Sequence, residues 1–268
     1  MSGGPDPAAA RWRLVLATDL DGTFLGGTPD ARAALYGWIR RHQDSVGLIF
    51  VTGRDPDFIH ALCAGTGAEA CGVPVPDYVV ADVGTTVARV ERRNGAPALS
   101  LLRDLEAPIA AAWGDRSAFV RETLAGAPGL VPQDTPFRHR VSYHYDPSRY
   151  DPAATGPLAD AGLDILISAD RFLDVLPGGV NKGSTLLALL EHLGLARDRV
   201  LVAGDTLNDL SMFRTGLFGA VVGGAEAALR DATRALPHTL HCRAPGAGGI
   251  IEAIAAFGLH PAPPEASQ

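Results

Sequence analysis

The sequence predicts an α/β protein: a parallel sheet with helices on its faces and an inserted α+β segment. An apolar run at residues 14–17 leads into a glycine-containing turn at 19–23, as is typical of a strand buried on both faces of a parallel sheet. Similar runs alternate with helical periodicity over residues 29–81 and again after residue 172. Between these two sections the pattern changes to a hairpin and alternating strands, which indicates a distinct antiparallel unit.

The first section reads as strand-helix-strand-helix-strand. We expect strands at 14–17, 46–51 and 78–81, with helices at 29–41 and about 55–64. Helical crossovers of this kind join parallel strands, so the carboxyl ends of the three strands lie at one edge of the sheet. Ligands of open α/β sheets bind outside that edge.

The middle section has a different order of elements. Strands are expected at 85–91 and 97–102, on either side of the hairpin turn Asn94-Gly95. They are followed by a helix at 115–124, an alternating strand at 138–145, a proline-interrupted helical stretch near 152–161 and a strand at 163–168. This section therefore reads as α+β rather than α/β.

From residue 172 the α/β pattern resumes. An extended segment is expected at 172–176, further strands at 200–203, 219–222 and 239–242, and helices at 182–193, 225–235 and 250–257. The ends of the chain, at about 1–10 and 260–268, are rich in Pro and Ala and are expected to be tails.

Composition excludes several classes of protein. The net charge of −7 argues against a general binder of nucleic acid or anionic membranes. No apolar run approaches the ~20 residues that span a bilayer, and the first ten residues lack the apolar segment of a signal peptide. Cys63, Cys71 and Cys242 show no metal-ligand spacing, and we interpret them as reduced packing residues of a cytoplasmic protein that is a monomer or weak homo-oligomer.

Four groups of polar residues fall at predicted strand ends or helix starts. They are Asp19 with Asp21, Thr52 with Gly53, Lys182, and Asp205 with Asp209. Each has an ordinary interpretation on its own, such as a helix cap or a turn residue. Lys182 is unusual because a cation in the first turn of a helix opposes the helix dipole and needs an anion nearby. Since parallel topology places all four groups at one edge, we expect a common site.

These residue types suit phosphoryl transfer. Mg²⁺ takes oxygen ligands, which Asp19, the backbone carbonyl of Asp21 and Asp205 can supply. The hydroxyl of Thr52, the amide of Gly53 and the ammonium of Lys182 can hold phosphate oxygens. One carboxylate must then remain free for covalent attack on phosphorus.

The four groups resemble the four motifs of the haloacid dehalogenase superfamily of phosphohydrolases. The matching segments are Asp19-Leu-Asp21-Gly-Thr23, Thr52-Gly53-Arg54, Lys182 and Gly204-Asp205-x-x-Asn208-Asp209. The resemblance implies a Rossmann-like core in which Asp19 is the nucleophile and Asp21 is the general acid and then base. It also implies Mg²⁺ held at Asp19, Asp21, Asp205 and Asp209, and phosphate or substrate bound at Thr52, Gly53, Arg54, Lys182 and Asn208.

The inserted segment resembles the α/β cap of that superfamily. We expect a cap at 103–169 and a discontinuous catalytic core at 1–102 and 170–268. Three segments resemble the sucrose-phosphate phosphatase group, although Arg140 stands where we expect a lysine: Val83-Gly84-Thr85, His139-Arg140-Val141-Ser142-Tyr143 and Asp174-Val175-Leu176-Pro177-x-Gly179-x-Asn181-Lys182-Gly183. This implies a small-molecule substrate, a sugar phosphate of the sucrose-phosphate or a related glycosyl-phosphate type.

Arg138, Arg140 and His144 share one face of the predicted strand at 138–145, because side chains alternate along a strand. A solvated face is one interpretation; sugar or phosphate binding by Arg138 and Arg140 is the other.

Three alternatives to a phosphatase stay open. A phosphosugar mutase also uses an aspartyl-phosphate, and a sensor of sugar phosphates could retain the fold, although Asp19 and Asp21 are both present. A receiver-like signalling protein also surrounds an acceptor Asp with acids, a Thr and a Lys, but it would be one short domain without the insertion.

Overall fold

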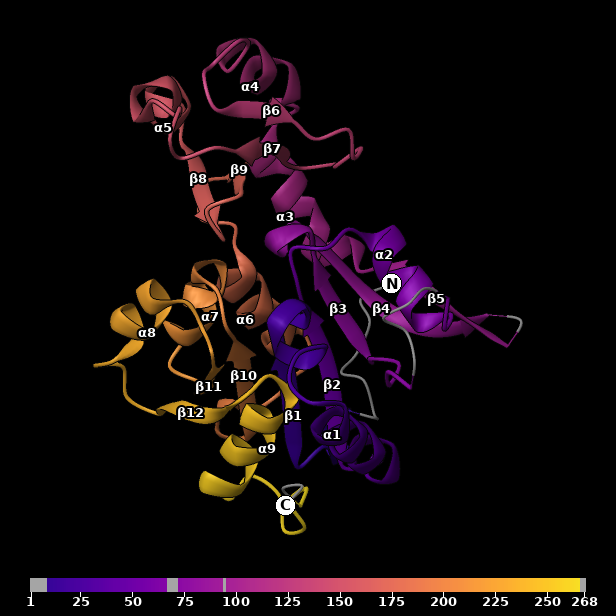
Figure 1. The fold of residues 1–268 in the computed structure, drawn as a ribbon. Coiled ribbons are helices and arrows are strands. Elements are labelled where there is room, and N and C mark those ends of the chain that lie inside the picture. Colours follow the sequence, from indigo (N-terminus) through magenta and orange to yellow (C-terminus); the bar gives the residue numbers. More distant parts are fainter. Residues whose placement is uncertain (1–8, 67–71, 94, 266–268) are drawn as a thin grey trace.

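An eight-stranded sheet forms the base of the molecule in the computed structural model, which describes residues 9–66, 72–93 and 95–265 (Figure 1). The strands are β1 (Leu14–Thr18), β2 (Val46–Val51), β3 (Tyr78–Ala81), β4 (Thr86–Arg93), β5 (Ala96–Leu101), β10 (Val200–Gly204), β11 (Phe218–Gly223) and β12 (Thr239–Pro245). Their order is β12-β11-β10-β1-β2-β3-β4-β5; the first six strands in this order are parallel, β4 is antiparallel to β3, and β5 is antiparallel to β4. The expectations for Cys71, Asn94 and the extreme tails fall outside the described residues.

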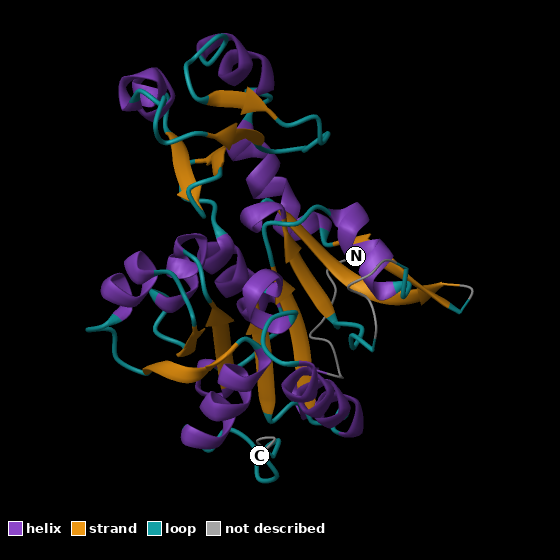
Figure 2. Ribbon diagram, in the orientation of Figure 1, coloured by secondary structure: helices purple, strands orange, loops and turns teal. Residues whose placement is uncertain are grey.

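Helices cover both faces of this sheet (Figure 2). Along β1, Leu14 and Leu16 pack into one core cluster, whereas Val15 and Ala17 pack into another. Helices α1 (Pro29–Arg41), α2 (Pro56–Cys63) and α9 (Ala247–Ala256) belong to the first cluster. Helices α6 (Lys182–His192), α7 (Leu210–Phe213) and α8 (Ala227–Thr233) belong to the second. The expected α/β fold with a parallel-dominated sheet is confirmed.

A smaller antiparallel sheet stands over the carboxyl edge of the large one (Figures 1 and 2). Its strands are β6 (Leu130–Pro132), β7 (Val141–Tyr145), β8 (Leu163–Ser168) and β9 (Phe172–Pro177), in the order β6-β7-β9-β8. Helices α4 (Ser117–Thr123) and α5 (Gly156–Asp160) pack against it around a separate core that includes Val120, Tyr143 and Leu158. We call this upper part the cap.

Helix α3 (Arg103–Trp113) connects the two parts, and the sequence analysis does not predict it. Pro108 lies inside the helix, where proline normally signals a break. The helix forms because Ile109 buries its side chain in the core of the large sheet, while Trp113, one turn later, buries its side chain in the core of the cap. One rigid element therefore contacts both hydrophobic cores.

Two strand expectations of the sequence analysis are wrong in detail. The strand expected at 138–145 begins only at Val141, so the alternation argument does not apply to Arg138 and Arg140. The segment at 172–176 does not return to the large sheet: it is β9, which pairs with β7 and β8. A three-residue loop, 169–171, joins β8 to β9 as a hairpin, and Ala169 and Asp170 in it have positive φ. Because β9 belongs to the cap sheet, we propose that the cap extends past residue 169 to the end of β9.

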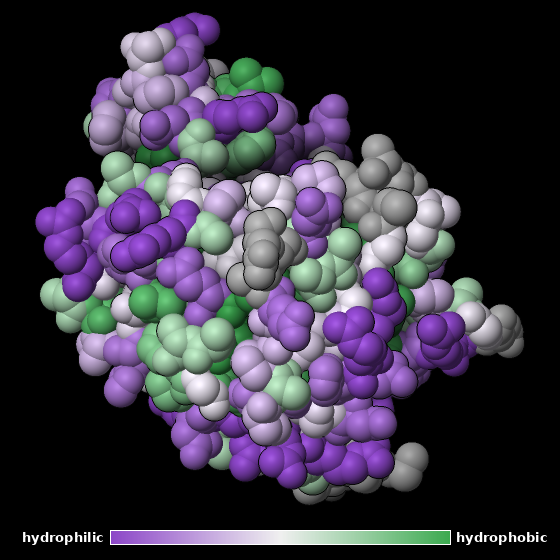
Figure 3. Space-filling view, turned by 60° about the horizontal axis from the view of Figure 1, so that its bottom comes forward, coloured by the Kyte–Doolittle hydropathy of each residue, from purple (hydrophilic) through white to green (hydrophobic). Residues whose placement is uncertain are grey.

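The surface opposite the cap is mainly hydrophilic. The face seen in Figure 3 carries small apolar patches separated by polar residues. Among the described residues, no helix is long and apolar enough to cross a membrane. Cys63 and Cys242 are free thiols, and Cys242 is buried.

Candidate active site

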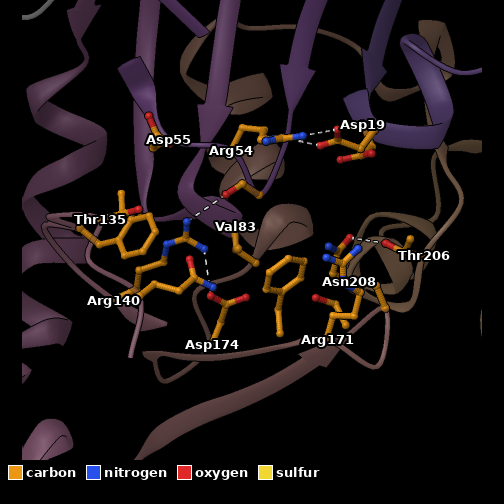
Figure 4. A pocket seen from close by; sticks show the side chains of 17 residues that line it. Asp19, Arg54, Asp55, Val83, Thr135, Arg140, Arg171, Asp174, Thr206 and Asn208 are labelled. Atoms are coloured by element: carbon orange, nitrogen blue, oxygen red, sulfur yellow. Dashed lines mark hydrogen bonds and ion pairs between the residues drawn. The ribbon is translucent and has the colours of Figure 1, made fainter. Parts of the chain in front are cut away.

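A cavity of about 550 Å³ lies between the carboxyl edge of the large sheet and the cap (Figure 4). Six of the sequence-predicted site residues line it: Asp19, Asp21, Gly53, Arg54, Arg140 and Asn208. Four others, namely Thr52, Lys182, Asp205 and Asp209, lie behind the residues that form its wall. The expectation that these strand ends meet at one edge is confirmed by the pairing of β10, β1 and β2.

Asp19 follows β1 directly, and the chain then turns sharply. Gly22 makes the turn possible with φ +74°, and it also leaves room for Asp205: a Cβ at position 22 would lie 2.2 Å from Asp205 Oδ2. Asp205 follows β10 in the same way, and the hydroxyl of Thr23 donates to its Oδ1 at 2.8 Å. The two strand ends therefore hold their carboxylates close together.

Lys182 supplies a completely buried ammonium group behind Asp19. Its Nζ lies 2.7 Å from Asp19 Oδ1 and 2.6 Å from Asp209 Oδ1, and it donates to Asn208 Oδ1 at 2.9 Å. The residue sits at the start of α6 because Asn181 caps the helix in a reciprocal pair with Ser184. The anion that a cation at this position requires is thus provided by Asp19 and Asp209.

One ammonium does not balance the carboxylates around it. Burial raises the pKa of Asp19 well above its usual range despite Lys182, and Asp209 and Asp205 raise it further. Burial, reinforced by Asp209, raises the pKa of Asp205 to about 7. For Lys182, burial alone would lower the pKa, but Asp19 and Asp209 raise it above its ordinary value. The site therefore favours additional positive charge.

A divalent cation fits this need. One carboxylate oxygen from each of Asp19, Asp205 and Asp209 lies within 4.8 Å of the others, and hard cations such as Mg²⁺ prefer such oxygen ligands. The side chain of Asp21 is outside this group. Asp209 also fixes the turn that carries it, since its Oδ2 accepts the amides of Asp205 and Thr206 at 3.0 and 3.1 Å.

Asp21 faces the cavity with its carboxylate bound by Arg54. The Nε and Nη2 atoms of Arg54 donate to the two carboxylate oxygens at 2.8 and 2.7 Å, and the guanidinium lies over the ring of Phe58. Both side chains are about half exposed, at 42% for Arg54 and 50% for Asp21, so this pair can open at little cost.

Thr52 is buried at the end of β2. Its Oγ1 accepts the backbone amide of Arg54 at 3.1 Å, while Gly53 reaches the cavity wall. The strand end thus places a hydroxyl and a backbone turn next to Asp19.

The two cap arginines of the sequence analysis have different surroundings. Arg138 does not line the cavity: it makes a two-pronged contact with Glu106 at 2.7 and 2.8 Å and donates to Thr86. The structure gives no support for its predicted contact with substrate. Arg140 does line the cavity, and its guanidinium contacts Asp174 and the carbonyl of Gly53.

The cavity also contains residues that the sequence analysis did not single out as site residues. From the cap these include Phe137, Arg171 and Phe172. Asp82 does not line the cavity, but it lies behind the wall and contacts Arg140. Asp174 belongs to a segment that resembles the sucrose-phosphate phosphatase group, but its sequence position alone indicated no role. No spacing in the sequence marks these positions, because their proximity depends on how the cap sits over the core.

Comparison with known proteins yields one family. Residues 12–258 match the family described as sucrose-6F-phosphate phosphohydrolase. A glucosylglycerol-phosphate synthase of Pseudomonas anguilliseptica is 40% identical over 92% of this chain, although the chain spans only 31% of that relative's length. A mannosylfructose-phosphate phosphatase of Agrobacterium fabrum is 29% identical over 92% of this chain and 98% of its own length.

A solved structure shares the whole architecture. The sucrose-phosphatase of Synechocystis sp. PCC6803, determined with sucrose and phosphate, superposes with a TM-score of 0.79 at 25% identity. The match covers 92% of this chain and 98% of that protein. The similarity therefore includes the cap as well as the core.

Proposed function

Since the chain belongs to the sucrose-6F-phosphate phosphohydrolase family of haloacid dehalogenase-like phosphatases, we propose that it hydrolyses the phosphate ester of a glycoside. The relatives named above are a phosphatase of mannosylfructose phosphate, a phosphatase of sucrose phosphate and a larger synthase of glucosylglycerol phosphate. Each name refers to a phosphorylated glycoside. The cavity volume of about 550 Å³ suits a small-molecule ligand of this kind.

The main support for the proposal is that Asp19 and Asp21 both line the same cavity. In the proposed first step, a carboxylate oxygen of Asp19 attacks phosphorus, the bond to the sugar oxygen breaks, and Asp21 gives that oxygen a proton. In the second step, water attacks the phosphorus of the aspartyl-phosphate, Asp21 takes the proton of the water, and Asp19 is regenerated with release of phosphate.

The remaining residues bind and orient the phosphate. We propose that the Thr52 hydroxyl, the Gly53 amide and Lys182 hold its oxygens, with Asn208 fixing the ammonium of Lys182 at 2.9 Å. Lys182 also keeps Asp19 directed at the cavity through the 2.7 Å contact.

Mg²⁺ is the cation that we propose for the acidic group. Asp19, Asp205 and Asp209 would hold it, and when bound it would neutralise charge on the transferring phosphate. Release of phosphate should stop after exhaustive chelation and return on addition of Mg²⁺, whereas Ca²⁺ should inhibit because its coordination is larger and more flexible. Full activity after chelation would contradict this part of the proposal.

The direct test is phosphate release from a panel of phosphorylated glycosides, with monosaccharide phosphates for comparison. At least one glycoside phosphate should be hydrolysed well above the monosaccharide phosphates. Asp19→Asn keeps the shape of the side chain but removes the attacking charge, so it should lower turnover by several orders of magnitude. Retention of more than about a tenth of the activity would exclude Asp19 as the nucleophile.

A further inference from the structure

We propose that Arg140 is a positioning residue: from the cap, it orients the phosphate-binding hydroxyl of Thr52 through the peptide between Gly53 and Arg54. The inference rests on the proposed phosphatase function and assigns Arg140 a role other than sugar binding. It begins from one contact between the two parts of the molecule, in which Arg140 Nη2 donates to the backbone carbonyl of Gly53 at 2.9 Å (Figure 4).

The Thr52-Gly53-Arg54 turn is held by all three of its carbonyl oxygens. The amide of Val83 donates to Thr52 O and the amide of Asp82 donates to Arg54 O, each at 3.0 Å. Both donors come from the turn after β3, where Asp82 and Val83 adopt positive φ values of 53° and 60°. The carbonyl between them, that of Gly53, receives its donor only from Arg140 among the contacts of the described residues.

The Gly53 carbonyl controls the hydroxyl of Thr52. In a trans peptide, the C=O of one residue and the N–H of the next point in opposite directions. Holding Gly53 O therefore fixes the direction of the Arg54 N–H, which donates to Thr52 Oγ1 at 3.1 Å. A hydroxyl has one hydrogen to donate. Because its oxygen already accepts the Arg54 amide, the Thr52 hydroxyl is left to donate its own hydrogen to phosphate.

The guanidinium of Arg140 is itself fixed from several sides. Its Nη1 donates to Asp174 at 3.0 Å, and its Nη2 also lies 3.4 Å from Asp82. Its Cζ lies 3.7 Å from the centre of the Phe137 ring. The side chain is only 5% exposed, and Asp174 is held in turn by the hydroxyl of Ser142. A lysine could not reproduce this planar set of contacts.

These contacts favour a positioning role over a sugar-binding role. Both terminal nitrogens of Arg140 already donate within the protein, to Asp174 and to Gly53. Its Nε is buried without a hydrogen-bond partner among the described residues, and the side chain is only 5% exposed, so little of the guanidinium is accessible to a sugar. Contact with the core turn, in contrast, needs no movement.

The experiment uses p-nitrophenyl phosphate, which has no sugar, and inorganic phosphate as a ligand. In the full chain with Mg²⁺, Arg140→Met should lower kcat/KM for this substrate about tenfold and weaken phosphate binding, measured by calorimetry, to a similar extent. Arg140→Lys retains the charge and serves as the folded variant if Arg140→Met unfolds; it should show the same two losses.

A double-mutant cycle with Thr52→Val tests the route of the effect. If Arg140 acts through the Thr52 hydroxyl, substitution of Arg140 should cost less than about twofold once that hydroxyl is absent. The matched control is Arg138→Met, which removes a neighbouring contact between cap and core without touching Gly53. That variant should keep both constants for these ligands within about twofold.

Three results would overturn the inference. One is an Arg140 variant that binds phosphate and cleaves p-nitrophenyl phosphate normally and is impaired only with glycoside phosphates. Another is an equal loss in Arg138→Met, which would indicate general loosening of the cap. The third is full additivity with Thr52→Val. The proposed function fails separately, if the unmodified chain hydrolyses no phosphate ester; phosphate binding would still test Arg140 in that case.

Discussion

Asp21 lines the cavity, and Arg54 binds its carboxylate. If Asp21 transfers the proton, the effect of replacing it should depend on the leaving group of the substrate. Asp21→Asn should slow both chemical steps. A sugar leaving group needs protonation far more than an aryl one, so hydrolysis of a glycoside phosphate should fall further than hydrolysis of p-nitrophenyl phosphate. Initial rates with the two substrates provide the measurement. Equal losses would count against Asp21 as the general acid.

We expect His260 to make the folded protein less stable at acid pH. It is 6% exposed, and its ring nitrogens bond to Ser45 Oγ and to the backbone of Ala262. Burial lowers its pKa below the ordinary value. The unfolded chain then binds the proton more strongly, so this residue makes the folded state less stable as pH falls below about 6.5.

The measurement is the urea concentration at the midpoint of unfolding, at pH 7.5 and at pH 5.5. His260→Gln should narrow the difference between the two midpoints. His139 and His241 also have lowered pKa values, so part of the difference should persist. The exposed His144 supplies the control, and His144→Gln should leave the difference unchanged. An unchanged difference in His260→Gln would contradict the assignment.

At the scale of elements, we expect substitution of Gly84, in the turn after β3, to destabilise the protein. Its φ is +104°, and a Cβ there would lie 2.4 Å from the carbonyl carbon of Asn181, the N-cap of α6. Gly84→Ala should displace the start of α6 with Lys182 and lower the free energy of unfolding by about 3 kcal/mol. Chemical denaturation measures the loss, and phosphatase activity should fall with it.

Gly224 is the matched control for that substitution. It has a similar φ of +85°, but no atom lies within 4 Å of a Cβ placed there. Gly224→Ala should therefore cost only the backbone strain, about 1–2 kcal/mol. Equal losses at the two positions would mean that contact with Asn181 is unimportant.

The elements also show how far sequence patterns reach. The strand ends that carry Asp19, Thr52 and Asp205 could be predicted because each follows a continuous apolar run along the chain. Helix α3 could not, since its side chains are buried by two separate cores that exist only after folding. Likewise β9 depends on pairing with β7 and β8, and the Arg140 contact with Asp82 joins residues 58 positions apart.

For the whole molecule, removal of the cap predicts a loss of discrimination. Helix α3 packs on the core up to Ile109, and β9 ends at Pro177, so a Gly/Ser linker should replace residues 113–176. Slow Mg²⁺-dependent hydrolysis of p-nitrophenyl phosphate should persist, reduced by the loss of Arg140. Preference among glycoside phosphates should disappear. Circular dichroism should show that the shortened protein is folded. If it still preferred one glycoside phosphate, the core rather than the cap would have to recognise the sugar.

The order of strands in the large sheet has a consequence for how the chain reaches this structure. Central strand β1 pairs with β2, which follows it soon along the chain, and with β10, which begins at Val200. During synthesis from the N-terminus, one edge of β1 therefore stays unpaired until the whole cap has emerged. Pairings between such distant segments slow folding and leave strand edges open to wrong partners. Refolding should consequently be slow, with the cap, whose pairings are more local, acquiring protection from hydrogen exchange before β1 does.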